Sequence, residues 1–104
     1  MNEADVKKII ADLIRTKTLK SAISEIYDDI SSKLYRYYRG EDYDISVTEA
    51  LDGLRNDIHF EIIPLYYQQH LTIEQIADVL YIDVSTVIRN KKRLCLEIYS
   101  YIEE

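Results

Sequence analysis

Two helix-start signals follow one another closely between Leu71 and Leu94, and they constrain the fold more than any other feature of the chain. Thr72 and Gln75 have the spacing of a capping box, in which each side chain accepts a hydrogen bond from the other residue's backbone N–H. Asp83 is a second N-cap residue. An aliphatic residue before each cap is expected to pack against one inside the helix, Leu71 with Ile76 and Ile82 with Val87. The segment therefore predicts two short helices joined by a tight turn.

The surfaces of these two predicted helices differ. The first has a buried face of small and aliphatic residues, namely Ile76, Ala77, Val79 and Leu80. The second is expected to turn four apolar residues inward: Val84, Val87, Ile88 and Leu94. It also carries four cations and no acid from Arg89 to Arg93, which predicts a helix-turn-helix whose second helix meets phosphate. The alternative is a purely structural hairpin, because any small helical bundle contains capped helices.

The segment from Thr72 to Leu94 resembles the C-terminal helix-turn-helix of sigma factors, their region 4. It resembles still more closely the small phage regulators that share this motif, the late-gene activators of the ArpU and RinA type. The segment from Ile62 to Thr72 is similar to the helix that precedes the motif in those proteins. The family usually has Gly in the turn, where this chain has Tyr81. The resemblance implies sequence-specific binding of double-stranded DNA and control of transcription, in a protein encoded by a bacterial phage or mobile element.

Within this motif, the second helix supplies the residues expected to reach base edges in the major groove, namely Ser85, Thr86, Arg89 and Asn90. Arginine pairs with guanine and asparagine with adenine through two hydrogen bonds each. Five other residues are expected to contact DNA phosphates: Thr72, Gln75, Lys91, Lys92 and Arg93. We also expect the ring of Tyr81 to pack in the turn and to support the motif from behind, together with Tyr66 and Tyr67.

The rest of the chain predicts an all-α small helical bundle, one compact domain in which amphipathic helices precede the helix-turn-helix. The 104 residues suit a single domain. The chain has only two glycines and one proline, the residues that most often form turns, and this scarcity favours an all-helical fold. Residues 1–45 form an N-terminal helical region with helices expected over 2–17 and 18–38, the second ending at Gly40. Their apolar stripes either fold back onto residues 46–104 or pair with a second copy. We favour the second possibility, a homodimer in which the two copies associate through the segment from Val6 to Tyr38.

A third helix is expected to begin at Ser46. Ser46 and Glu49 have the spacing of another capping box, with Ile45 and Ala50 as the apolar pair around it. This helix runs toward Pro64, which should kink it or split it in two.

The net charge of −6 conflicts at first sight with DNA binding. Acidic residues gather between Glu41 and Glu61, however, and basic ones between Arg89 and Arg93, so the local field decides what the second motif helix attracts. With few phosphate-contacting cations, one copy should bind weakly.

The acidic segment is either a solvated surface or a site for a basic partner. The second possibility supports an alternative function, a sigma-like module that contacts RNA polymerase without reading DNA. A structural helical dimer is a third hypothesis.

Other classes of function find no support in the sequence. No apolar run is long enough to span a membrane, and the charged first residues do not form a signal peptide. The single Cys95 forms no internal disulfide and suits a reducing cytoplasm. His59 and His70 lack metal-ligand spacing, and the calcium-loop pattern after Asp42 lacks its glycine. We therefore expect a cytoplasmic protein that is not an enzyme and has no cofactor, metal or membrane partner.

Overall fold

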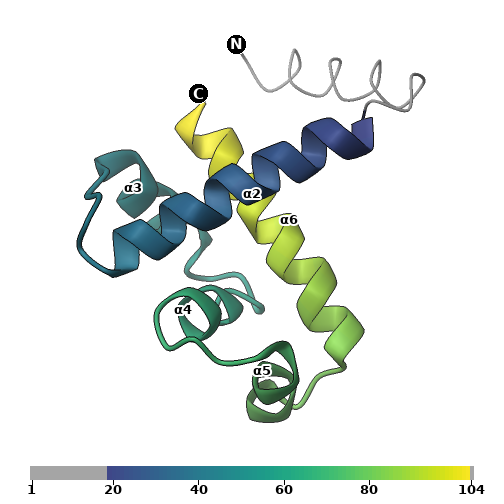
Figure 1. Ribbon diagram of the computed structural model, residues 1–104. Coiled ribbons are helices and arrows are strands. Elements are labelled where there is room, and N and C mark those ends of the chain that lie inside the picture. Colours follow the sequence, from purple (N-terminus) through teal and green to yellow (C-terminus); the bar gives the residue numbers. More distant parts are fainter. Residues whose placement is uncertain (1–18, 104) are drawn as a thin grey trace.

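The computed structural model describes residues 19–103, and every regular element in that range is a helix (Figure 1). In chain order they are α2 (Leu19–Tyr38), α3 (Ile45–Leu54), α4 (Ile62–Tyr67), α5 (Ile73–Leu80) and α6 (Val84–Ile102). The predicted all-α small bundle is confirmed. The helix expected over 2–17 lies outside the described residues.

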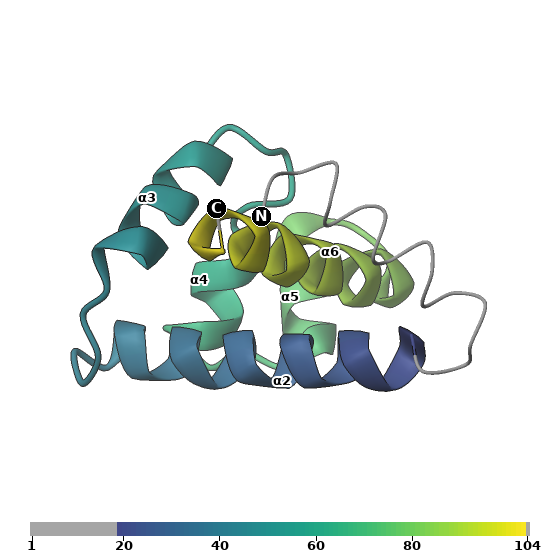
Figure 2. The same ribbon diagram turned by 90° about the horizontal axis from the view of Figure 1, so that it is seen from above.

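Helix α6 is the centre of the molecule, since α2, α3, α4 and α5 all pack against it. In Figure 1, α2 crosses α6 near its middle, and α5 lies beside the end where α6 begins. Seen from above, α2 runs along one side of the molecule, and the other described helices lie on the other side of it (Figure 2). The first turns of α6 therefore project past the region where α2 and α3 cover it.

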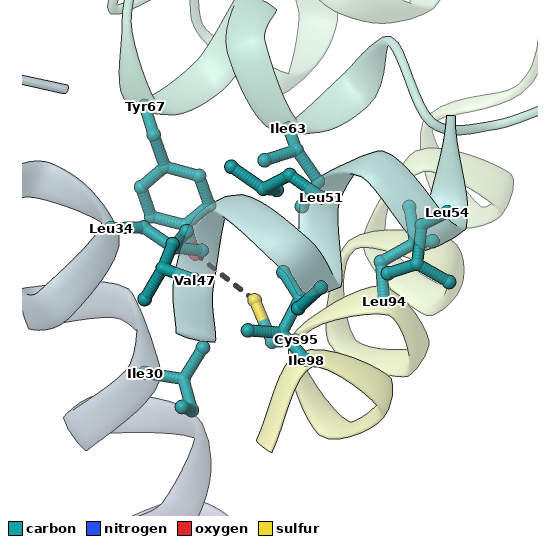
Figure 3. Close-up of a cluster of buried hydrophobic side chains, with 11 residues drawn as sticks. Ile30, Leu34, Val47, Leu51, Leu54, Ile63, Tyr67, Leu94, Cys95 and Ile98 are labelled. Atoms are coloured by element: carbon teal, nitrogen blue, oxygen red, sulfur yellow. Dashed lines mark hydrogen bonds between the residues drawn. The ribbon is translucent and has the colours of Figure 1, made fainter. Parts of the chain in front are cut away.

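The larger core cluster draws residues from four helices (Figure 3). Its members are Ile30, Leu34, Val47, Ala50, Leu51, Leu54, Ile63, Tyr67, Leu94, Cys95 and Ile98. Burying an aliphatic side chain of this size stabilises the fold by about 1.5–3 kcal/mol. The cluster takes residues from both sides of position 45, so α2 belongs to the same core as the C-terminal helices. The apolar stripe of α2 thus folds back onto its own chain.

Tyr67 carries a polar group into the middle of this core. Its hydroxyl lies 2.6 Å from the Ser31 hydroxyl oxygen and 3.4 Å from the sulfur of Cys95, the contact drawn as a dashed line in Figure 3. Burial raises the pKa of the Tyr67 hydroxyl and of the Cys95 thiol, so both stay neutral. Cys95 is completely buried.

A second, smaller core cluster fixes α5 against α4 and α6. It contains the buried residues Ile62, Ile76, Ala77 and Val87, with Leu65, Tyr66, Leu71, Ile73, Leu80 and Ile82 packed at its edge. Both of the predicted aliphatic pairs, Leu71 with Ile76 and Ile82 with Val87, are members of this cluster. The small side chain of Ala77 faces inward here, where the helices approach closely.

The start of α5 is the predicted capping box. The Gln75 N–H donates to the Thr72 hydroxyl oxygen at 3.1 Å, and the Thr72 N–H donates to the Gln75 side-chain oxygen at 2.9 Å. Asp83 is the N-cap of α6, with extended backbone, but its side chain makes no cap hydrogen bond. Both predicted helix starts are therefore confirmed, and only the first is held by a side-chain bond.

The expected capping box of Ser46 and Glu49 is wrong. Helix α3 already begins at Ile45, and its N-cap is Asp44, whose carboxylate accepts the Ser46 N–H at 2.8 Å. The Lys33 ammonium of α2 lies 2.9 Å from the other oxygen of the same carboxylate. This ion pair ties the start of α3 to α2.

The glycine signal marks the end of α2, whereas the proline signal does not mark the end of α3. Gly40 has a φ of 76° and donates its N–H to the Tyr37 carbonyl at 3.1 Å, which closes α2 as predicted. Helix α3 ends at Leu54, and Pro64 lies in the first turn of the separate helix α4, where the missing N–H costs nothing. The expected helix is thus divided in two, but the break covers residues 55–61 and Pro64 lies within α4, so the predicted kink or split at the proline is wrong.

The prediction for Tyr81 is wrong. Its side chain is 94% exposed, so the ring supports nothing behind the turn. Its backbone is in the left-handed region, with φ 57° and ψ 45°, and the next residue, Ile82, donates its N–H to the Ala77 carbonyl at 3.0 Å. The turn between α5 and α6 is therefore made by a strained backbone at Tyr81, in a conformation that glycine adopts freely.

Candidate nucleic-acid interface

The first half of α6 presents one exposed face, which we call the α6 face. It consists of Val84, Ser85, Ile88, Arg89 and Lys92, all of them exposed. Because successive residues of a helix turn by about 100°, these positions share one side of the helix. The residues of α6 that are buried in the core are Val87, Lys91, Leu94, Cys95 and Ile98, and Val84 and Ile88 adjoin them on the helical projection.

The four residues expected to read bases separate into two pairs. Ser85 and Arg89 lie on the α6 face, and the Arg89 guanidinium makes only a long contact of 3.5 Å with the Thr86 hydroxyl. Thr86 and Asn90 are half-buried at its margin. The Asn90 side-chain nitrogen donates to the Thr86 carbonyl at 2.8 Å, and its oxygen accepts from Arg93 at 3.1 Å. Asn90 thus bonds within its own helix at both ends of its amide, and the expected pairing with adenine is not available in this structure.

Lys91 corrects the set expected to contact phosphates. It is only 9% exposed, and its ammonium lies 3.8 Å from the centroid of the Tyr66 ring and 5.2 Å from that of Tyr27. Lys91 lies one turn from both Val87 and Cys95, on the buried side of α6, so its aliphatic stem packs into the molecule. The ring faces of the two tyrosines stabilise its charge. This lysine is a core residue rather than a phosphate ligand.

Arg93 is also occupied by the protein itself. Its guanidinium makes two hydrogen bonds of 3.0 Å to the carboxylate of Asp57 and one of 3.1 Å to Glu97. Arg93 and the His59 N–H lower the pKa of the Asp57 carboxyl, so this acid is charged at neutral pH. The expected phosphate contact by Arg93 is therefore replaced by a two-point ion pair that ties α6 to the segment between α3 and α4.

Arg89 and Lys92 are the two cations of the α6 face. Within residues 19–103, neither takes part in an ion pair. Thr72 and Gln75 are exposed at the start of α5, as the expected phosphate contacts require, and the side chain of each already accepts a hydrogen bond from the backbone N–H of the other. The acids Glu74, Asp78 and Asp83 are exposed on α5 and in the turn. Between Thr72 and Leu94, the exposed cations without an ion pair to a described residue are therefore Arg89 and Lys92.

The sequence placed Val84 and Ile88 in the core, and the structure places them on the α6 face. Val84 is 39% exposed and Ile88 is 52% exposed. The buried arc of α6 is centred between Val87 and Lys91, so these two residues lie at its edge. Periodicity gives no signal for this exposure, because Lys91 and Cys95, which lie on the same side of α6 as Val84, are buried. Val79 on α5, also expected inside, is exposed as well.

A shallow groove of about 290 Å³ borders the α6 face on its α2 side. It is lined by Ser24, Tyr27, Ile73, Ile88, Lys91 and Lys92. Among the described residues, no three His, Cys, Asp or Glu side chains are arranged to hold a metal ion. In the same range, no helix has both the length and the apolar character needed to cross a bilayer.

Comparison with known proteins adds no relative: no family model, curated protein or solved structure matches the chain. The exposed residues of α5 and α6 and their local charge are therefore the basis on which a function is assigned.

Proposed function

We propose that this chain is a sequence-specific regulator of transcription that binds double-stranded DNA through a helix-turn-helix formed by α5 and α6. The observation that carries the proposal is the α6 face. It projects Ser85, Arg89 and Lys92 from the start of a long helix whose other side is fixed in the core. A helix is about 10–12 Å across with its side chains, which matches a major groove about 12 Å wide.

The structure supports a smaller set of contacts than the sequence suggested. Arg89 is exposed and close to the start of α6, so it is the residue we assign to a guanine edge through two hydrogen bonds. Ser85, one turn earlier, is assigned to a base edge or the adjacent phosphate. Lys92 is assigned to a phosphate, because it lies one turn further from the helix start. The Thr72 hydroxyl, at the start of α5, is the remaining phosphate donor.

The α6 face has two cations, Arg89 and Lys92, and these alone give weak attraction to DNA. Each phosphate neutralised contributes about −0.9 to the slope of log affinity against log salt, so Lys92, the cation assigned to a phosphate, should give one copy a slope of only about −1 from this face. Two copies on neighbouring half-sites, about one helical turn apart, double the contacts. We therefore include a homodimer on DNA in the proposal. Exposed acids repel the duplex, including Glu74, Asp78 and Asp83 beside the α6 face, so the attraction comes from Arg89 and Lys92 of that face.

A second candidate function is a protein-interaction module that contacts RNA polymerase without reading DNA. Val79, Tyr81, Val84 and Ile88 are large apolar or aromatic side chains exposed on α5, the turn and α6. Exposed apolar residues close together are typical of protein-binding surfaces. The loss of Lys91 and Arg93 from the exposed cations also favours this candidate.

Selection of binding sites from a random duplex library separates the two candidates. The full-length chain is mixed with the library, bound duplexes are amplified, and the enriched duplex is titrated against a scrambled one at several salt concentrations. Capture of purified RNA polymerase by the same chain is measured in parallel. An enriched site bound more tightly than its scrambled version supports DNA reading. Polymerase capture with no enriched site supports the interaction module and overturns DNA reading. If the chain neither enriches a site nor captures polymerase, both candidates are overturned and the structural helical dimer is the remaining hypothesis.

A further inference from the structure

We infer that Val84 and Ile88 are specificity residues that contact the 5-methyl groups of thymines, so that the preferred DNA site carries thymine next to the position read by Arg89. This inference rests on the proposed DNA-binding function and extends it by naming the base chemistry that the apolar part of the α6 face recognises.

The first argument is the position of these two side chains. Val84 and Ile88 are one turn apart, so they lie one above the other along one edge of the α6 face. Ser85 and Arg89 repeat the same spacing about 100° further round the helix, and Lys92 lies between the two rows. The face therefore has an apolar row and a polar row, side by side, both pointing to where a duplex would lie.

The second argument is the chemistry of the major groove. Donors and acceptors line most of it, and the thymine methyl is the one apolar group that a standard base pair presents there. Exposed Val and Ile side chains form no hydrogen bonds with water, so removing their surface from water is favourable. Cytosine has no methyl group against which they could bury that surface. Of the four bases, thymine is thus the one against which this row buries apolar surface.

The spacing of the two residues sets the spacing of the thymines. Four residues of helix advance by about 6 Å, whereas successive base pairs on one strand are about 3.4 Å apart. Val84 and Ile88 therefore reach methyl groups about two base pairs apart when α6 lies along the groove. Arg89 follows Ile88 directly in the chain, which places the guanine that it reads close to the second thymine.

The test removes the methyl group alone. In the duplex enriched by the full-length chain, each thymine is replaced in turn by deoxyuridine, which keeps every hydrogen-bonding group and lacks only the 5-methyl. Burial of one such group is equivalent to about a 4-fold change in affinity. We expect uracil at two positions, and only there, to weaken binding about 4-fold each.

Two variants show which side chains see the methyl groups. At one of the two positions, replacing thymine by uracil should leave the affinity of Ile88→Ala unchanged. At the other position, the same replacement should leave the affinity of Val84→Ala unchanged. Ile45→Ala is the matched control, because Ile45 is 56% exposed, similar to Ile88, but lies at the start of α3. This control should keep the full preference for thymine over uracil at both positions.

The outcomes distinguish this inference from the function on which it rests. If no duplex is enriched, DNA reading itself fails and the inference falls with it. If a site is enriched but contains no thymine, or if uracil leaves affinity unchanged at every position, DNA reading stands and the inference is wrong. It is equally overturned if Val84→Ala and Ile88→Ala both keep the wild-type preference for thymine over uracil.

Discussion

The ammonium of Lys91 lies 3.8 Å from the centroid of the Tyr66 ring, inside the contact between α6 and α4, while its neighbour Lys92 is exposed to solvent. Adjacent residues of a helix diverge by about 100°, and here that angle separates a core residue from a surface one. Two lysines that look equivalent in the sequence therefore have different roles: Lys91 stabilises the core, and Lys92 is the lysine that we assign to a DNA phosphate.

Replacing each of these lysines by alanine should separate the tasks. Lys91→Ala loses the contact with the tyrosine rings and the buried stem, so the free energy of unfolding should fall by about 1–3 kcal/mol. Lys92→Ala should stay within about 0.5 kcal/mol of wild type. Urea denaturation measures both changes. In DNA titrations, Lys92→Ala should make the salt slope shallower by about one unit. Equal losses of stability in the two variants would contradict the assignment.

Tyr81 provides a test of backbone strain without any loss of core packing. Its ring is exposed and its φ is 57°, so replacing it by glycine removes the cost of the left-handed backbone and no buried contact. After allowing for the greater freedom of glycine in the unfolded chain, we expect Tyr81→Gly to stabilise the fold by about 0.5–1 kcal/mol. Thermal melting measures this change. Tyr81→Ala lacks the ring but keeps the left-handed backbone strain, so it is the control and should melt close to wild type. A Tyr81→Gly variant that melts no higher than Tyr81→Ala would contradict the strain, and a Tyr81→Ala variant that melts well below wild type would show that the ring contributes to stability.

The ion pair between Asp57 and Arg93 predicts a dependence of stability on pH. Because the pKa of Asp57 is lowered below its ordinary value of 3.8, this acid stabilises the fold above that value. The stabilisation should disappear as pH falls through the lowered pKa. Arg93 and Asp57 are both partly exposed, so solvent screening limits the difference between wild type and Asp57→Asn to about 1 kcal/mol at pH 7.

Asp52→Asn is the matched control for this ion pair. Asp52 pairs with Arg55 through a single contact of 2.9 Å in which both side chains are well exposed. Its replacement should change the urea midpoint little at any pH, because exposed pairs contribute little. If wild type and Asp57→Asn differ as much at pH 2 as at pH 7, the charge of Asp57 is not the cause of the difference.

The α6 face has only two cations, Arg89 and Lys92, and this small number predicts that two copies bind one DNA site. We expect sedimentation of the full-length chain at micromolar concentration to give twice the mass of one chain, and its complex with the enriched duplex to contain two copies. A monomer that binds the duplex tightly as a single copy would contradict the homodimer and would require more phosphate contacts than Arg89, Lys92 and Thr72 supply.

Local signals were the part of this fold that the sequence could predict. The capping box of Thr72 and Gln75 depends on atoms three residues apart, so its presence is decided by the segment itself. The same holds for Gly40, whose left-handed backbone ends α2. In the candidate site, Ser85, Arg89 and Lys92 were predicted to be exposed because they lie opposite Val87 and Leu94 in any helix with this periodicity.

Partners that are distant in the chain explain what the sequence could not predict. Lys91 is buried because Tyr27 and Tyr66 approach it from α2 and α4, and Arg93 is neutralised by Asp57 from another segment. The exposure of Val84 and Ile88 depends on how far α2 and α5 extend around α6. Periodicity along one helix contains none of this information.

The most direct test of the central claim compares two arginines of equal charge. Arg89 belongs to the α6 face, whereas Arg55 is exposed after the end of α3 and pairs only with Asp52. Each is replaced by alanine, and the affinity for the enriched and the scrambled duplex is measured at several salt concentrations. Arg89→Ala should lose about 1–3 kcal/mol on the enriched duplex and relax the preference at one base pair, while Arg55→Ala should bind as wild type does. Equal behaviour of the two variants on both duplexes would contradict the assignment of α6 as the helix that reads DNA.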